Sequence, residues 1–245
     1  MSESIITTAF GVGPDEWVDL ADKFKHIPPS EMSQIHLPEV AARGWSIDLP
    51  PTLLFLDVLY IRKILSVDVD PPRDAVFEAG CCQAVIKIGN STTIENDELI
   101  FQALWIMTIL ASGTAEHVAK VVQFGGVECY TKHLINTTNH EILEHAAWGV
   151  GTLASDNTTV RDVILATKLP AAAVEKWQFV LDSCSISVKR NFAWMAGSIC
   201  RGKPSASMDA IKPLIPVLIS AVRDDDCEVR CDALWAFSYI TDGPD

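Results

Sequence analysis

Positive charge is scarce in this sequence. Its 245 residues include 19 Lys and Arg against 32 Asp and Glu, which gives a formal net charge of −13 at pH 7. A protein that binds the phosphate backbone of a nucleic acid needs a surplus of basic side chains, so we expect no nucleic-acid ligand. The acidic surplus favours a basic partner, or a surface that simply keeps the chain in solution.

Long apolar runs are also missing. The two most apolar stretches, residues 53–65 and 211–222, are short and contain charged side chains, so neither is predicted to span a membrane. The first residues, MSESIITTAFGVGPDEW, have no basic lead and no long apolar run, and we therefore expect no signal peptide. The seven cysteines lie mostly within apolar patterns, and this odd number indicates a reducing compartment rather than a disulfide framework.

The sequence shows no motif typical of catalysis. It contains no Gly-rich phosphate loop, nucleophile elbow or paired-carboxylate pattern. Cys227 and Cys231 lie one helical turn apart, but no second ligand pair of suitable spacing accompanies them. We therefore expect no enzymatic activity, no cofactor and no metal. The acidic run at residues 224–226 is interpreted as a solvated turn.

Four similar segments recur along the chain, and each contains one tryptophan among small or apolar residues. They are QALWIMTILASGT (102–114), HAAWGVGTLASDN (145–157), NFAWMAGSICRGK (191–203) and DALWAFSYITDGP (232–244). Their tryptophans are 43, 46 and 41 residues apart, which is typical of solenoids with two or three helices per repeat. Shorter apolar-periodic segments lie between them, so each repeat is predicted to contain a short helix, a second helix and a long third helix.

The repeats are predicted to begin near residue 50. Residues 51–68 have the pattern of a long helix, and residues 71–92 that of two helices separated by a glycine. The first 49 residues are acidic and proline-containing, and they are predicted to form a partly disordered or loosely packed tail. Residues 50–245 are predicted to hold the repeats. The last long helix has no obvious polar cap, so we expect truncation there, or a partner or second copy on that face.

The tryptophans suggest a binding surface. If the third helices line one side of the solenoid, their indoles form a row of flat walls with slots between them. Such a slot suits the methylene stem of Lys or Arg, and cation–π attraction of about 0.5–2 kcal/mol favours the charged end. Acids near the tryptophans, such as Asp156, would complete a concave groove for an extended basic peptide. The alternative is that these tryptophans belong to the core and that Asp156 only marks a helix end.

The same segments resemble the importin alpha (karyopherin alpha) family, the armadillo-repeat adaptors for nuclear localisation signals. The similarity covers about residues 50–245, and DDDCEVRCDALWAFSYITDGP is its most specific part. The resemblance implies an all-α, right-handed superhelical armadillo-repeat solenoid of about four to five repeats, similar to the N-terminal half of the family's repeat domain. It also implies binding of Lys/Arg-rich localisation peptides of cargo proteins, and a location in cytoplasm and nucleus.

The resemblance implies two peptide-binding sites. The major site would contain Trp105, Gly113, Trp148, Asp156 and Trp194, with Asp156 pairing with the key lysine of the signal and Gly113 admitting that lysine. The minor site would contain Glu228, Asp232, Trp235 and Tyr239. Arg201 would lie between the two sites, although an arginine at a helix end is also explained by the helix dipole.

The sequence departs from the family's pattern at the positions four residues after three tryptophans. Ile109, Thr152 and Ser198 stand where the family has asparagines that bind the peptide backbone, and His145 stands where it has Gln. Thr and Ser can still form a hydrogen bond and Ile cannot. Since each bond contributes about 0.5–1.5 kcal/mol, losing two or three weakens binding by roughly ten- to a thousandfold. A scaffold that keeps the fold and has lost signal binding is therefore the second hypothesis.

The N-terminal segment lacks the Arg/Lys-rich helix by which the family binds importin beta. Importin beta is therefore not an expected partner by that route.

Overall fold

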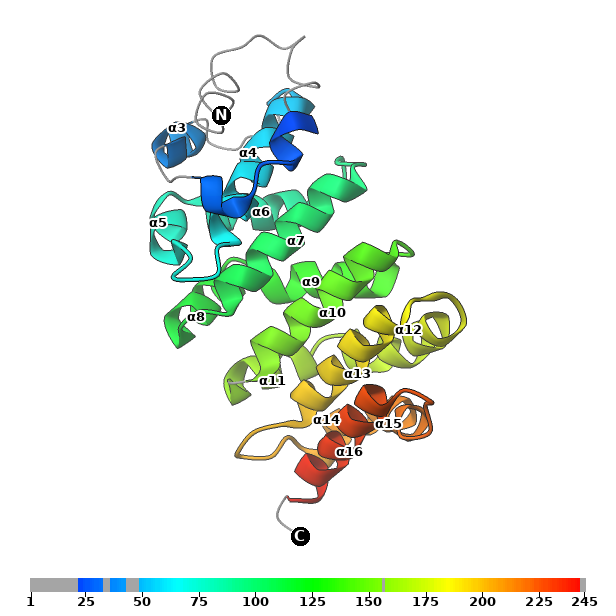
Figure 1. Cartoon of the computed structure of the whole chain (residues 1–245). Helices are drawn as coiled ribbons and strands as arrows, with labels where there is room; N and C mark the ends of the chain where they lie inside the picture. The colour runs from blue at the N-terminus through cyan, green and yellow to red at the C-terminus, as the bar shows by residue number, and fades with distance from the viewer. Residues whose placement is uncertain (1–21, 33–35, 43–48, 156, 243–245) are drawn as a thin grey trace. The chain divides into compact units, whose positions relative to one another are not determined.

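The computed structural model describes residues 22–32, 36–42, 49–155 and 157–242. Every regular element in these ranges is a helix (Figure 1). The chain forms two compact units, residues 1–110 and 111–245, which are described separately. Over the described ranges, the helices are all too short or too polar to cross a membrane.

The first unit is built around one long buried helix. Its described elements are η2 (Pro29–Glu31), α3 (Leu37–Ala42), α4 (Pro51–Leu65), α5 (Arg73–Glu78), α6 (Cys81–Asn90) and α7 (Asp97–Ala111). Pro51 suits the first turn of α4, where a backbone N–H has no helical partner. Every residue of α4 from Leu54 to Ile61 is buried, so the helix is enclosed rather than amphipathic.

Part of the segment before residue 50 is packed in this unit. Phe24, Leu37 and Val40 are buried. The Nζ of Lys63, at the end of α4, donates hydrogen bonds to the backbone carbonyls of Lys25, at 2.7 Å, and Ile27. Burial lowers the pKa of Lys63 to about 8. The predicted domain boundary near residue 50 stays a prediction.

The second unit repeats a group of three helices. Its described elements are α8 (Ala115–Gln123), α9 (Gly126–Asn136), α10 (His140–Ser155), α11 (Thr158–Leu165), α12 (Leu169–Ser183), α13 (Ile186–Cys200), α14 (Met208–Ile211), η4 (Lys212–Leu214), α15 (Ile215–Ala221) and α16 (Cys227–Thr241). The long third helices α10, α13 and α16 lie side by side in that order (Figure 1). The predicted three-helix repeat is confirmed in this unit.

Glycines set two features of the repeats. Gly80 and Gly125 adopt left-handed backbone conformations, with φ of 73° and 96°, at the turns that separate α5 from α6 and α8 from α9. Gly151 and Gly197 lie inside third helices. A Cβ on Gly151 would clash with the indole of Trp194, and one on Gly197 would lie 3.2 Å from the backbone carbonyl oxygen of Asp232. Small residues therefore let neighbouring third helices approach closely.

Candidate functional site

Repeated tryptophans line two cavities in the second unit. The larger has a volume of about 390 Å³, and its lining includes Gly113, Trp148, Thr152, Asn157 and Trp194. The smaller, of about 80 Å³, is lined by Trp194, Gly197, Ser198, Arg201, Asp232, Trp235 and Tyr239. The indole of Trp194 therefore borders both cavities.

Two of the repeated tryptophans are open to solvent. Trp148 is 37% exposed and Trp235 is 56% exposed. The ring of Tyr239 stacks on that of Trp235, with centroids 5.9 Å apart. By contrast, Trp177 in α12 is 3% exposed and packs on Phe192 in the core. The core alternative therefore does not hold for Trp148 or Trp235.

His145 borders the indole of Trp148. The two rings meet edge to face, with centroids 5.7 Å apart, and the Nδ1 of His145 lies 3.2 Å from the backbone carbonyl oxygen of Glu141. Burial holds the pKa of His145 below its usual value, while the Glu141 carbonyl and the Glu144 carboxylate act in the opposite direction. Burial therefore favours the neutral form of the imidazole beside Trp148.

The positions four residues after the tryptophans offer little to a peptide backbone. The hydroxyl of Thr152 donates to the backbone carbonyl of Trp148 at 2.9 Å, so it can only accept a further hydrogen bond. Ser198 is buried and borders the smaller cavity. Ile109, in the first unit, has an apolar side chain, and its backbone carbonyl accepts a bond of 2.8 Å from Arg73 Nε. The side chains of Thr152 and Ile109 therefore offer no free donor to a ligand, whereas asparagine would.

The two predicted acids of the minor site have different surroundings. Asp232 borders the smaller cavity, and its burial, together with the nearby Glu228 carboxylate, raises its pKa. Glu228 lies outside the lining of that cavity, and its Oε1 is 3.1 Å from Nη1 of Arg190. A basic ligand in the smaller cavity would thus meet Asp232, whereas the charge of Glu228 is already paired.

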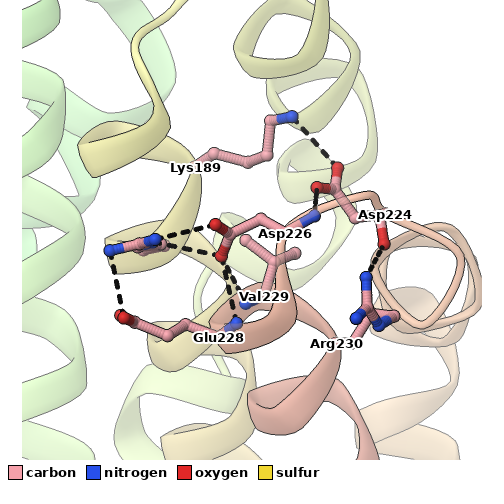
Figure 2. A network of polar contacts seen from close by, with 7 residues as sticks. Lys189, Asp224, Asp226, Glu228, Val229 and Arg230 are labelled. Carbon is pink, nitrogen blue, oxygen red and sulfur yellow. Dashed lines mark hydrogen bonds and ion pairs between the residues drawn. The ribbon is translucent and has the colours of Figure 1, made fainter.

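The acidic run at residues 224–226 belongs to a polar network that joins α13 to α16 (Figure 2). The Nζ of Lys189 lies 3.0 Å from Asp224, whose side chain is 8% exposed. Arg190 donates to both carboxylate oxygens of Asp226, at 3.0 and 2.7 Å. This pairing is the main cause that lowers the pKa of Asp226 to about 2. The interpretation of this run as a solvated turn is therefore wrong for Asp224 and Asp226.

Trp105 belongs to the first unit and has a basic side chain of the same chain over its ring. The Cζ of Arg62, in α4, lies 4.9 Å from the indole centroid. The Nε of Arg62 also donates to Oε1 of Gln102 at 2.8 Å. The edge of Phe101 contacts the same indole, with ring centroids 5.6 Å apart. Nothing in the local pattern of residues 53–65 indicates this contact, because its partners lie one repeat further on.

The remaining predicted residues are Gly113, Asp156 and Arg201. Gly113 is exposed in the loop before α8 and borders the larger cavity. Asp156 lies outside the described residues, so its lysine-pairing role stays a prediction. Arg201 follows the last residue of α13, and its side chain borders the smaller cavity. The buried Arg161, which sequence reasoning missed, donates to the backbone carbonyls of Arg201, at 3.0 Å, and Pro204, at 2.9 Å, and so holds this loop in place.

The site contains no evident metal centre. No group of three or more His, Cys, Asp or Glu side chains in the described part of the chain is arranged to hold a metal ion.

Known proteins resemble the chain in sequence. A family model for HEAT-like repeats matches residues 186–240. Importin subunit alpha-2 of Arabidopsis thaliana is 31% identical over 207 residues, covering 84% of this chain and 37% of the relative. Importin subunit alpha-2 of Caenorhabditis elegans is 33% identical, covering 76% of this chain and 34% of the relative. Importin subunit alpha-1b of Oryza sativa subsp. japonica is 32% identical, covering 74% and 33%. The chain thus spans about a third of the length of these relatives.

Solved structures resemble the chain in fold. An engineered protein superimposes with a TM-score of 0.78 at 21% identity, covering 98% of this chain and 96% of its own. A designed armadillo repeat protein in complex with the peptide (KR)4 gives a TM-score of 0.73 at 18% identity, covering 97% and 98%. The predicted all-α armadillo solenoid is confirmed by these likenesses. Together with the importin alpha relatives, they show that the chain is an importin-alpha-like armadillo-repeat protein.

Proposed function

We propose that the chain is a peptide-binding module of the import-adaptor type, which holds Lys/Arg-rich nuclear localisation segments of cargo proteins along α10, α13 and α16. The observation that carries this proposal is the pair of cavities that share the indole of Trp194 and have the exposed indoles of Trp148 and Trp235 beside them. Such a module works between cytoplasm and nucleus.

Binding in this proposal uses stacking and charge, without covalent chemistry. The flat face of an indole accepts the methylene stem of a lysine or arginine, and the ring attracts its charged end. Asp232 supplies a carboxylate at the smaller cavity, and Asp156 is proposed to supply one near the larger. The net charge of −13 attracts basic segments from a distance.

One observation favours the second candidate function, a scaffold without signal binding. Glu228 of the predicted minor site already pairs with Arg190. The hydroxyl of Thr152, which stands where the family has a peptide-binding asparagine, already donates to its own helix. A scaffold would keep the repeats and the exposed Trp235 for a protein partner or a second copy, and would not discriminate basic peptides.

The test is a titration of the chain with a fluorescent lysine-rich nuclear localisation peptide, followed by anisotropy. We expect Trp148→Ala to raise the Kd by about tenfold, because a cation–π contact contributes about 0.5–2 kcal/mol and tenfold corresponds to about 1.4 kcal/mol. Val174→Ala is the matched control, since Val174 is also 37% exposed but lies on α12, away from both cavities. Absence of binding at low salt, or equal effects of the two variants, would overturn the proposal in favour of the scaffold.

A further inference from the structure

The contact between Arg62 and Trp105 joins two consecutive long helices of the first unit, α4 and α7. Arg62 places its guanidinium over the indole at the distance typical of a cation–π pair. That is the contact which the proposed function assigns to a lysine or arginine of the bound peptide. One of the four repeated tryptophans is thus already stacked by an arginine of its own chain.

Arg62 is held in this position by more than the ring. Its Nε donates to Gln102 Oε1 at 2.8 Å, and Gln102 Nε2 in turn donates to Glu98 Oε1 at 2.9 Å. Glu98, Gln102 and Trp105 lie on one face of α7, because they are separated by four and three residues. Gln102 is buried, so its side chain has little freedom to turn away. The guanidinium is therefore fixed by the ring, by an amide and by a nearby carboxylate.

A peptide would compete poorly for this position. Its basic side chain could offer the indole the same cation–π attraction, but it would have to displace Arg62 from Gln102 and from the attraction of Glu98. Burial lowers the pKa of Arg62 and the Glu98 carboxylate opposes that shift, which indicates a partly dehydrated guanidinium whose attraction to the ring is strengthened. The arginine is also attached to the chain, so it loses no translational freedom on making the contact.

We propose that Arg62 is a built-in substitute for a peptide's basic side chain at Trp105, so that this indole accepts no base from the ligand. The inference rests on the proposed function. Arg62 is then a specificity-determining residue, because the basic side chains of a bound segment are bound only at Trp148, Trp194 and Trp235. A segment gains no affinity from a further lysine or arginine opposite Trp105.

The experiment observes each indole separately. The full chain is prepared with 5-fluorotryptophan, and the ¹⁹F signals of Trp105, Trp148 and Trp194 are assigned by replacing each with Phe. The protein is then titrated with the peptide (KR)4. We expect the signals of Trp148 and Trp194 to shift with the peptide concentration while that of Trp105 stays in place.

The matched variants are Arg62→Met, which keeps an unbranched apolar stem over the ring, and Arg62→Lys, which keeps a cation. In Arg62→Met we expect the Trp105 signal to shift with the same concentration dependence as those of Trp148 and Trp194. In Arg62→Lys we expect it to stay in place. Circular dichroism verifies that each variant is folded. If a variant does not fold, the titration of the unmodified chain still tests the inference.

The possible outcomes separate the inference from the function on which it rests. A Trp105 signal that moves together with the other two in the unmodified chain overturns the inference and leaves the proposed function intact. A Trp105 signal that stays in place in Arg62→Met also overturns it, because Arg62 is then not what keeps the peptide away. If no indole signal shifts in any protein, the proposed function fails and this inference fails with it.

Discussion

Individual tryptophans in this chain serve two different purposes. Trp177 fills the core between α12 and α13, whereas Trp148 and Trp235 lie at the surface beside cavities. The difference comes from their neighbours. A small residue on the neighbouring helix leaves room for a repeated tryptophan, because the indole of Trp194 on α13 lies where a side chain on Gly151 of α10 would be. None of the four repeated tryptophans is buried, whereas Trp177 is, so the repeated motif, rather than the residue type, indicates a position outside the core.

Gly151 tests this explanation at a single position. A methyl group there would clash with the indole of Trp194. We expect Gly151→Ala to destabilise the fold by about 1–3 kcal/mol, as overpacking does, and to shift the tryptophan emission. In a Trp194→Ala background the clash is absent, and the same change should stabilise α10 by up to about 1 kcal/mol, because alanine favours a helix over glycine. Urea unfolding of the four proteins measures both values. Equal effects in the two backgrounds would show that Trp194 is not the obstacle.

At the scale of the elements, the sequence predicts the positions of the helices well and the contacts between helices poorly. Apolar periodicity and glycine breaks place the helices, because these signals are local. The ion pairs and hydrogen bonds that join the helices are not local. Arg62 contacts Gln102 forty residues later, Arg161 contacts Arg201 at the same separation, and Arg190 contacts Asp226 thirty-six residues later. Each separation is close to one repeat, so the period is visible in the sequence while the pairs are not.

The same limit applies to the candidate site. The tryptophans that border its cavities were predictable because they recur along the sequence at a period of 41 to 46 residues. The pairing of Glu228 with Arg190, which leaves Asp232 as the carboxylate of the smaller cavity, depends on how α16 packs on α13. No pattern within either helix indicates it.

Asp226 connects α13 to α16 through an ion pair and the cap of α16. Its side chain accepts hydrogen bonds from the backbone N–H groups of Glu228 and Val229 at the start of α16, and it pairs with Arg190 of α13. We expect Asp226→Ala to lower the Tm by a few degrees, and Asp226→Asn, which keeps the cap and loses the charge, to lower it less. Thermal unfolding, monitored by circular dichroism, gives the Tm of the unmodified chain and of both variants. The reverse order would show that the cap contributes nothing.

The same residue predicts a dependence on pH. The pKa of Asp226 is about 2 in the folded chain, against an ordinary value of 3.8, so the unfolded chain binds the proton more readily. Its contribution to stability is therefore complete above pH 3.8 and is lost as the pH falls from there through 2. The unmodified chain should lose more stability than Asp226→Asn over this interval, as measured by urea unfolding at several pH values. If the free energy of unfolding of both proteins depends on pH in the same way, Asp226 is not the group that causes this loss.

At the scale of the whole chain, charge and stacking make separable contributions to peptide binding. The net charge of −13 and the carboxylate of Asp232 attract a basic segment by forces that salt screens, with a Debye length of about 10 Å at 0.1 M. Stacking on Trp148 is short-range and much less sensitive to salt. A variant that removes one contribution should therefore change the salt dependence differently from a variant that removes the other.

We expect Asp232→Asn to weaken binding of the lysine-rich peptide at low salt and to flatten the rise of Kd with salt. Trp148→Ala should instead raise the Kd by a similar factor at every salt concentration. Asp209→Asn is the matched control, because Asp209 is an exposed acid on α14 outside both cavities and changes the net charge equally. Anisotropy titrations at four salt concentrations give the slopes. If Asp209→Asn flattens the slope as much as Asp232→Asn, the overall field attracts the peptide and the smaller cavity does not select its charge.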